Sequence, residues 1–548
     1  MKLTLFFKNV TLLSILFFTT SCSSTKKPNK KINQSKVITL NFGDDPTSFD
    51  PRRVRDLASI TLMKALYEGL TRVTPDQKIE LGAAEKYEIS EDLKTYTFHL
   101  RPSKWTNGQE VTAENFEKAW KKALDPSFPC DNAFQMYVIQ NAKEAKEGRV
   151  STDEIGVKAI DKYTLRVDLK NPTPYFLQMI THPVFFPLPT SNFTAINSQE
   201  QAEVLATNGP FILKKWISND YLEVVKNPTY WDNNEVKLDG IKFVMVLPET
   251  ELMMYEKGEV DWTGSPLSSI SLDAMKDLEK KYSLHRQDFL STYFLRVNVA
   301  NFPLDQVKLR KALNLAIKRE EIVKHVLQGG QTTATSLVPA IMGLSQKDYF
   351  QDGDIQTAKT LFSEVCDELG VDVESFPEIS LTYIGVGRSR LISQALQQQW
   401  EQAFGIRVKL EAVENKIYFS KLSKKDYELI CCDWVADFDD PINFLEVFKY
   451  KTSDSNNTNW GNSEYTRLLD ESAKIVDTQK RKEILAESEA ILMNELPIMP
   501  IFYASMRYLK NENITDVVLS SLGSLDFKWA DLQGEKENAA KNVEFSNL

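Results

Sequence analysis

Four aspartates lie close together in the segment DWVADFDDP: Asp433, Asp437, Asp439 and Asp440. Carboxylates at this density can bind a metal ion or a cationic ligand, or they can line a solvated loop that binds nothing. An EF-hand calcium loop needs a glycine among its acids, and this segment has none. A carboxylate held out of bulk water would add about 1.5 to 3 kcal/mol net to the binding of a cationic group. The segment is therefore the first candidate for a binding site.

No residue pattern in the sequence supports catalysis. The sequence lacks the G-x-S-x-G elbow, the GxxxxGK[ST] phosphate loop and the dinucleotide fingerprint. Its histidines are isolated, and none has the HExxH spacing of metal ligands: His99, His182, His285 and His325. A nucleophile or soft-metal site at Cys431-Cys432 would need a neighbouring histidine, which is missing. We therefore expect a protein that is not an enzyme and that uses neither a cofactor nor a metal.

Length and charge limit the class of protein further. The chain has 548 residues, which is more than one hydrophobic core organises, so two or three domains are expected. Its composition, 42% hydrophobic and 26% charged, is typical of globular proteins. The net charge of −10 and the lack of a basic stripe in the body of the chain argue against a nucleic-acid partner.

The first 21 residues have the pattern of a secretory signal. Lys2 is followed by an apolar stretch that is continuous from Val10 to Phe18, too short to remain as a membrane span. Small residues directly before Cys22 resemble a bacterial lipoprotein signal, although Thr19 replaces the usual aliphatic residue. Cys22 would then carry the lipid, and 22–36, polar and basic, would be a disordered tether. The alternative is an ordinary signal cleaved nearby, with Cys22 discarded.

The body of the chain mixes strand and helix patterns. Alternation in TYTFHL (95–100) predicts a half-buried strand, and Thr112 is placed to cap a helix over 113–124. Residues 379–385, 390–404 and 406–413 read as strand, helix and strand, the order of a parallel or mixed sheet flanked by helices.

Two further segments have patterns that predict local structure. Apolar spacing predicts one long amphipathic helix over 310–327 that ends at Gly329-Gly330. Proline clusters at 172–189 and 496–502 should not continue a helix or a central strand, so we expect them to mark crossings between domains.

Seven phrases, in order over nearly the whole mature chain, resemble the extracellular solute-binding proteins of family 5, the oligopeptide and dipeptide receptors of ABC importers. They are TSFDP (47–51), ALYEGL (65–70), YTFHLRPSKWTNGQEVTAENF (96–116), TNGPFILKKW (207–216), NPTYWDNN (227–234), LDQVKLRKALNLAIKREEIV (304–323) and DWVADFDDPINFL (433–445). Most read as structural; Tyr230-Trp231, for example, should pack against a strand. The oligopeptide-binding lipoproteins look most similar.

The resemblance implies an α/β fold of periplasmic-binding-protein type, with two lobes, mixed sheets flanked by helices, and an extra domain on the first lobe. Such proteins enclose their ligand by hinge closure between the lobes. The implied boundaries are a signal at 1–21, a tether at 22–36, lobe I at 37–67, 190–290 and 505–548, the extra domain at 68–189, and lobe II at 291–504.

By the same resemblance, Asp437 would bind the α-ammonium group of a peptide. The remaining affinity would come from strand addition, with the peptide backbone pairing to Arg55–Ala58, which includes Leu57, and to Asp433–Val435. Trp434, Phe502 and Tyr503 would form pocket walls, or would simply pack in the core.

The sequence departs from the enteric oligopeptide receptors at several positions. Their cysteine pair is replaced by Ser291 and Val435, and Leu422 and Cys431 stand where arginines that meet peptide carboxylates would be expected. Arg388 and Arg390 could take over this role, although simple solvation is the plainer interpretation.

The implied protein is a monomeric, lipid-anchored receptor of the bacterial cell envelope that delivers short peptides to the permease subunits of an ABC importer. Two alternatives stay open. The same fold could bind murein-derived peptides, dipeptides or another small solute. A more distant alternative is a surface lipoprotein used in adhesion or signalling.

Overall fold

The computed structural model describes residues 35–190, 204–344, 348–385, 387–453 and 455–534, and Lys36 onward forms one compact unit. The predicted signal and nearly all of the predicted tether, with Cys22, lie outside the described residues. Within the part that is described, no helix combines the length and apolar character needed to cross a bilayer.

The first sheet is built from segments far apart in the sequence. Its order is β1 (Val37–Asn41), β10 (Gly240–Val244), β9 (Tyr221–Lys226) and β8 (Phe211–Ile217). β1 pairs parallel to β10, and the other neighbours are antiparallel. Helix α1 (Leu57–Leu66) packs against this sheet through β8, and its N-terminus is capped by Asp56, whose carboxylate accepts from the Ser59 N–H at 2.8 Å.

A second, fully antiparallel sheet lies between residues 84 and 168. Its order is β4 (Ala84–Ile89), β5 (Thr95–Leu100), β7 (Thr164–Asp168) and β6 (Val157–Ala159). The predicted strand at 95–100 is confirmed, with Tyr96, Phe98 and Leu100 buried. Helix α2 (Ala113–Ala123) packs on β6 and β7; its cap is at Thr112, as predicted, where the backbone N–H donates to Asn115 Oδ1 at 2.8 Å.

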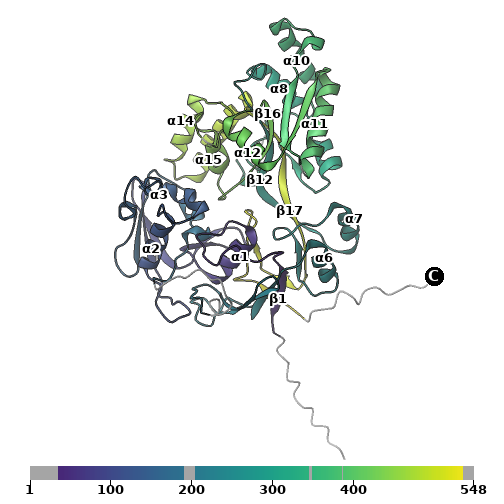
Figure 1. The fold of residues 1–548 in the computed structure, drawn as a ribbon. Helices are drawn as coiled ribbons and strands as arrows, with labels where there is room; N and C mark the ends of the chain where they lie inside the picture. The colour runs from purple at the N-terminus through teal and green to yellow at the C-terminus, as the bar shows by residue number, and fades with distance from the viewer. Residues whose placement is uncertain (1–34, 191–203, 345–347, 386, 454, 535–548) are drawn as a thin grey trace, which may run out of the picture. The chain divides into compact units, whose positions relative to one another are not determined.

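The third sheet has seven strands and contains the aspartate-rich segment at the end of one of them. Its order is β11 (Trp262–Gly264), β17 (Ile498–Lys510), β12 (His285–Val297), β16 (Leu429–Val435), β14 (Ile379–Ile384) and β15 (Val408–Val413), with β13 (Thr332–Thr333) paired to β17. The predicted strand, helix, strand order at 379–413 is confirmed, because α11 (Arg388–Phe404) joins β14 to the parallel strand β15. Figure 1 shows β12 and β17 running together through the molecule.

The prediction of one helix over 310–327 is wrong. The segment divides into α8 (Val307–Leu315), a short α9 (Arg319–Glu321) and a π-helical turn η4 (Ile322–Leu327). The guanidinium group of Arg319, fully buried, donates to the carbonyls of Asn314 at 3.1 Å and Pro500 at 2.6 Å. Asp352 also accepts from the Arg319 N–H at 3.0 Å, so the second helix has its own N-terminal cap.

The expectation that proline excludes a central strand is also wrong for residues 496–502. Pro500 lies within β17, which has strands on both sides. The register between β12 and β17 shifts between Tyr293 and Phe294, where Pro500 pairs with Phe294 and Ile501 is skipped. A bulge of this kind removes the need for the N–H that proline lacks.

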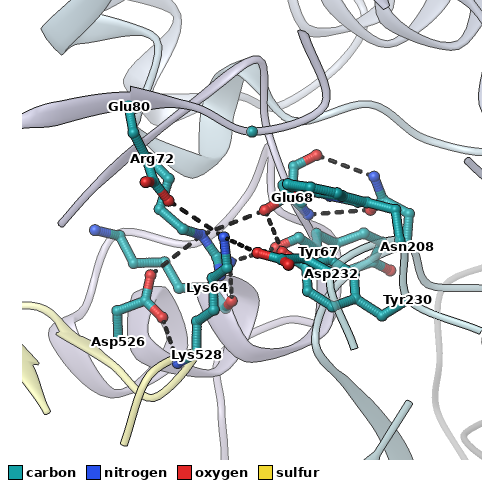
Figure 2. Close-up of polar contacts among 12 residues, drawn as sticks. Lys64, Tyr67, Glu68, Arg72, Glu80, Asn208, Tyr230, Asp232, Asp526 and Lys528 are labelled. Atoms are coloured by element: carbon teal, nitrogen blue, oxygen red, sulfur yellow. Dashed lines mark hydrogen bonds and ion pairs between the residues drawn. The ribbon is translucent and has the colours of Figure 1, made fainter. Parts of the chain in front are cut away.

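Three of the seven phrases meet in one buried polar network (Figure 2). Glu68 of ALYEGL accepts hydrogen bonds from the Tyr230 hydroxyl at 2.5 Å and from the indole N–H of Trp231. Asn208 of TNGPF accepts from the Glu68 N–H at 3.1 Å and donates to the Glu68 carbonyl at 3.0 Å. Tyr230 and Trp231 therefore do more than pack against a strand: they satisfy a buried carboxylate.

The same network ties the C-terminal segment to the residues that follow the first helix and to Asp232. Lys528, almost fully buried, pairs with Glu80 at 3.2 Å and with Asp232 at 3.0 Å. Arg72 pairs with Asp526 at 3.3 Å. Each buried charge thus has a partner of opposite sign, as burial requires. Figure 2 shows these side chains converging from distant parts of the chain.

Candidate functional site

The loop 436–440 follows β16 and is firmly anchored at its far end. Arg481, on helix α15 (Thr478–Glu495), donates two hydrogen bonds to the Asp440 carboxylate, both at 2.7 Å, and both side chains are largely buried. Asp440 also accepts from the Ile442 N–H at 3.0 Å, at the start of helix α13 (Ile442–Leu445). Asp440 is therefore structural, and its charge is already neutralised.

Contacts with other parts of the chain hold the middle of the loop. The ring of Phe438 stacks on Tyr175, with 4.8 Å between centroids and 3° between planes. The guanidinium group of Arg481 lies 5.4 Å from the Tyr175 ring centroid. Asp439 accepts from the Ser521 hydroxyl at 3.2 Å. Asp437 is the one aspartate of this loop that these contacts do not involve.

Asp437 is a partly buried carboxylate without an ion-pair partner among the described residues. Burial raises its pKa to about 6, and a hydrogen bond from Asn443 only partly offsets this shift. Asn443 is itself held in place, because its Oδ1 accepts from the Trp434 indole N–H at 2.9 Å and from the Asp437 N–H at 3.3 Å. A carboxylate in this state gains from the arrival of a cation.

Asn443 is a site residue that no motif in the sequence indicates. It lies six positions after Asp437, and it is a buried amide in the otherwise apolar helix INFL. A single polar residue on such a helix was the available signal, since a buried amide needs hydrogen-bond partners.

Strand β16 offers a free backbone edge beside Asp437. β14 pairs with β16 only at Leu429 and Ile430, and no described strand pairs on that side with the residues that follow. The N–H of Ala436 donates to Leu290 O at 2.8 Å. In an antiparallel ladder, hydrogen-bonded pairs alternate with pairs that are not hydrogen-bonded. Tyr293/Asp433 and Ser291/Val435 are therefore pairs of the second kind. The backbone groups of Asp433 and Val435 therefore point to the free edge.

Ser291 and Val435, the positions of the enteric cysteine pair, lie directly opposite each other. Neither is a cysteine, and the four described cysteines all have free thiols: Cys130, Cys366, Cys431 and Cys432. No group of three metal-ligating side chains occurs in the described part of the chain.

A pocket of about 260 Å³ opens where β14 and β16 separate. It lies beyond the carboxyl ends of the parallel strands β14 and β16, whose connections leave in opposite directions. Ligands of α/β sheets usually bind at such a position. Its lining includes Tyr293, Tyr418, Leu422, Cys431, Asp433 and Trp434. Leu422 and Cys431, which stand where arginines were expected, give apolar parts of this wall, and Arg296 is the arginine in the lining.

Arg55 and Leu57 are placed differently from each other. Arg55 is exposed and forms an ion pair with Asp131 at 2.9 Å. Helix α1 begins at Leu57, so Leu57 and Ala58 have helical backbones and do not provide a strand edge. The predicted pairing segment Arg55–Ala58 is therefore corrected: only Arg55 and Asp56 precede the helix, and Asp56, its N-cap, has an extended backbone.

Phe502 and Tyr503 lie inside the protein. Phe502 stacks on Tyr293 with 4.9 Å between ring centroids, and through Tyr293 it supports the pocket. The Tyr503 hydroxyl accepts from the Ser336 N–H at 3.2 Å and is buried. Both residues therefore pack in the core. Arg388 and Arg390 are exposed in the first turn of α11.

Comparisons with known proteins agree with this architecture. Residues 78–456 match the family described as bacterial extracellular solute-binding proteins, family 5, middle. The chain is 36% identical over 509 residues to the oligopeptide-binding protein OppA of Bacillus subtilis, covering 91% of this chain and 93% of that protein.

Two solved structures are also similar. One is the unliganded open form of the periplasmic murein tripeptide-binding protein MppA, with a TM-score of 0.81, 25% identity and coverage of 91% of this chain and 98% of that chain. The other is OppA of Haemophilus influenzae in complex with RPPGFSPFR, with a TM-score of 0.69, 28% identity and coverage of 91% and 99%.

Proposed function

Because the chain belongs to family 5 of the bacterial extracellular solute-binding proteins and has their two-lobed α/β fold, we propose that it captures short peptides between its lobes for an ABC importer. The family consists of binding proteins rather than enzymes. Asp437 binds the peptide's α-ammonium group, and a membrane permease receives the closed, loaded protein. Lipid on Cys22 and the tether at 22–36 hold the monomer at the cell envelope.

The observation that carries this proposal is the state of Asp437. Its carboxylate is partly buried, its pKa is raised to about 6 by burial, and no described basic side chain pairs with it. A peptide always presents one ammonium group, whatever its side chains are. A receptor that uses this charge as its fixed point can therefore accept many sequences.

The free edge of β16 supports the same proposal. Asp433 and Val435 direct backbone groups to this edge, where an extended peptide can add as a strand. Backbone pairing is the same for every peptide sequence. The adjoining pocket, with Trp434 in its wall, then accepts a side chain without demanding a particular one.

Calorimetry tests the proposal. Tri- to pentapeptides with free and with acetylated N-termini are titrated into the wild type, Asp437→Asn and, as a matched control, the exposed Asp426→Asn. Acetylation should weaken binding to the wild type about tenfold to a hundredfold, the worth of one charge-assisted hydrogen bond. Asp437→Asn should lose this discrimination and Asp426→Asn should keep it. Equal affinity of capped and free peptides for the wild type would exclude the ammonium anchor.

The alternatives make different predictions. Mass spectrometry of ligand released from denatured protein would distinguish short peptides from murein-derived peptides, dipeptides and other small solutes. An adhesion or signalling lipoprotein with an unused pocket would retain all its activity in Asp437→Asn. The lipid on Cys22 would be seen as added mass on the N-terminal fragment and lost in Cys22→Ser.

A further inference from the structure

Tyr175 contacts the loop 436–440 from outside the sheet that carries this loop. It ends the segment NPTPY (171–175), which follows β7 and precedes the short helix α4 (Phe176–Met179). Its ring stacks on Phe438, the residue after Asp437, with 4.8 Å between centroids and 3° between planes. This separation is within the range at which aromatic rings stabilise each other. The stack therefore holds the side chain next to the proposed ammonium anchor.

The same ring also contacts the residue that anchors the end of the loop. The guanidinium group of Arg481 lies 5.4 Å from the Tyr175 centroid, within the range of a cation–π interaction. Arg481 in turn donates two hydrogen bonds to Asp440, both at 2.7 Å. One ring therefore supports the loop at Phe438 and, through Arg481, at Asp440.

Tyr175 is itself fixed to the second sheet. Phe176, the next residue, is fully buried, and its ring centroid lies 5.0 Å from that of Tyr96 on β5. The Tyr96 hydroxyl donates to the carbonyl of Thr173 at 3.3 Å. Residues on both sides of Tyr175 are thus held by β5. The position of the Tyr175 ring is therefore set by a sheet other than the one that ends in the loop.

An ammonium anchor needs a loop that keeps one position. The N–H of Asp437 donates to Asn443 Oδ1 at 3.3 Å, which is longer than a usual N–H···O bond. A charge-assisted hydrogen bond weakens steeply when its geometry is lost, so freedom at Phe438 would lower the affinity for an ammonium group. Backbone pairing to β16 depends less on this loop, because Asp433 and Val435 precede it.

We propose that Tyr175 is a positioning residue for Asp437, and that the predicted extra domain at 68–189 serves the binding site by presenting this ring to the loop. The inference rests on the proposed function, because it takes Asp437 to bind the ammonium group of a peptide. The hydroxyl of Tyr175 forms no hydrogen bond with a described residue, so the aromatic ring carries this role. The predicted extra domain thus contributes to affinity as well as to the fold.

Calorimetry with matched variants tests the role of Tyr175. A free tripeptide and its acetylated form are titrated into the wild type, Tyr175→Phe, Tyr175→Leu, Phe438→Leu and the double leucine variant. Tyr282→Leu is the control, because Tyr282 is also half-buried but contacts Tyr255, at 5.6 Å, in a separate apolar cluster. Circular dichroism identifies a temperature at which the variants are folded, and all titrations are done there.

Loss of the stack should weaken the binding of the free peptide and spare that of the acetylated peptide. We expect Tyr175→Leu and Phe438→Leu each to lower the ratio of the acetylated to the free Kd about threefold to tenfold. Tyr175→Phe keeps the ring and should keep the ratio, as should Tyr282→Leu. Because the two leucine changes remove the same contact, the double variant should lower the ratio by less than the product of the single effects.

The outcomes separate this proposal from the proposed function. If acetylation weakens binding to the wild type but Tyr175→Leu and Phe438→Leu keep the wild-type ratio, the positioning role is wrong and the peptide receptor stands. Equal weakening of free and acetylated peptides would show that Tyr175 is only structural, which also overturns the positioning role. If Tyr175→Leu does not fold, the ratio in Phe438→Leu decides in the same way. If acetylation has no effect on the wild type, the ammonium anchor fails, and both proposals fail with it.

Discussion

The aspartates of the loop 436–440 differ in their availability to a ligand because their neighbours in the folded chain differ. Asp440 is neutralised by Arg481 through two hydrogen bonds of 2.7 Å, and Asp439 accepts from Ser521. Asp437 has only the amide of Asn443, so burial raises its pKa to about 6. The order of residues alone cannot distinguish these acids. The partner that each one meets in the folded chain decides which of them is available to a ligand.

The raised pKa predicts how affinity depends on pH. A peptide ammonium group needs the ionised form of Asp437, so a proton competes with the ligand below about pH 6. We expect the Kd of a free tripeptide to rise as the pH falls below 6, approaching tenfold per unit. Calorimetry between pH 5 and 8 would measure this. A Kd that is constant over this range, or an equal change in Asp437→Asn, would contradict the assignment.

The carboxylate of Asp437 should lower the free energy of unfolding when no ligand is bound to it. Its pKa is higher in the folded protein than in the unfolded chain, so the folded state binds more protons between about pH 4 and 6. The cost is fully present above this window and disappears below it. Unliganded Asp437→Asn should therefore melt at a higher temperature than the wild type at pH 7.5. Its free energy of unfolding should be larger by at most about 3 kcal/mol, and the difference should vanish near pH 4.

At the level of elements, the site depends on what the third sheet leaves unpaired. β14 stays with β16 for only two residues and then diverges, which frees the edge at Asp433 and Val435 and opens the pocket. Helix α15 supplies Arg481, which fixes the loop that follows β16. The binding residues are thus positioned by a strand end and a helix that lie far apart in the sequence.

Substitution of Arg481 should test this support. Arg481→Met leaves the buried Asp440 without its partner, and loss of one member of a buried ion pair costs about 3 to 5 kcal/mol. We expect a large fall in melting temperature and weaker peptide binding, because Asp437 lies on the loop that Asp440 anchors. Arg467→Met, which removes exposed pairs with Glu464 and Glu471, should cost less than about 1 kcal/mol. Similar effects of the two changes would show that Asp440 does not need Arg481.

For the whole molecule, the long paired strands β12 and β17 are the candidate hinge between the lobes. Each has 13 residues, and their pairing is interrupted between Asp288 and Thr292, where three residues of β12 face one of β17. A break in a hydrogen-bonded ladder is a natural place for a bend. We propose that the lobes close about this break. The predicted boundaries, including lobe II at 291–504, are part of that proposal.

Small-angle scattering with and without peptide would measure closure. Saturating tripeptide should reduce the radius of gyration of the wild type, because contacts made only in the closed state favour that state. At about 100 times its Kd the peptide should also add about 2.7 kcal/mol to the free energy of unfolding. Asp437→Asn, which should bind the peptide about tenfold to a hundredfold more weakly, should gain only about 0.4 to 1.4 kcal/mol at the same peptide concentration and should become compact to a smaller extent. A constant radius in the loaded wild type would exclude closure.

The amino-acid sequence was sufficient for the fold class and for local elements. Alternation predicted β5, capping predicted the start of α2, and strand and helix patterns predicted β14, α11 and β15. These features depend on neighbours in the chain, whose effects can be read over short windows. The phrases that resemble family 5 predicted the two-lobed plan, which the comparisons confirm.

Other features depended on contacts that no short window contains. The helix expected at 310–327 breaks because buried Arg319 binds carbonyl groups of Asn314 and Pro500, and the proline run at 496–502 enters a central strand because a bulge accommodates Pro500. Asn443 had only a weak local signal, a polar residue on an apolar helix, and its partners Trp434 and Asp437 are known only from the fold.

Hydrophobic pattern and capping are local properties, so the sequence by itself determined elements such as β5, α2, β14, α11 and β15, and the phrases that resemble family 5 determined the class of fold. The availability of Asp437 and the free edge of β16 arise from burial and from strand pairing between segments that are separate in the sequence. Burial and electrostatic interaction depend on distance in space rather than on separation along the chain. For that reason only the tertiary structure decided which of the candidate residues can bind a ligand.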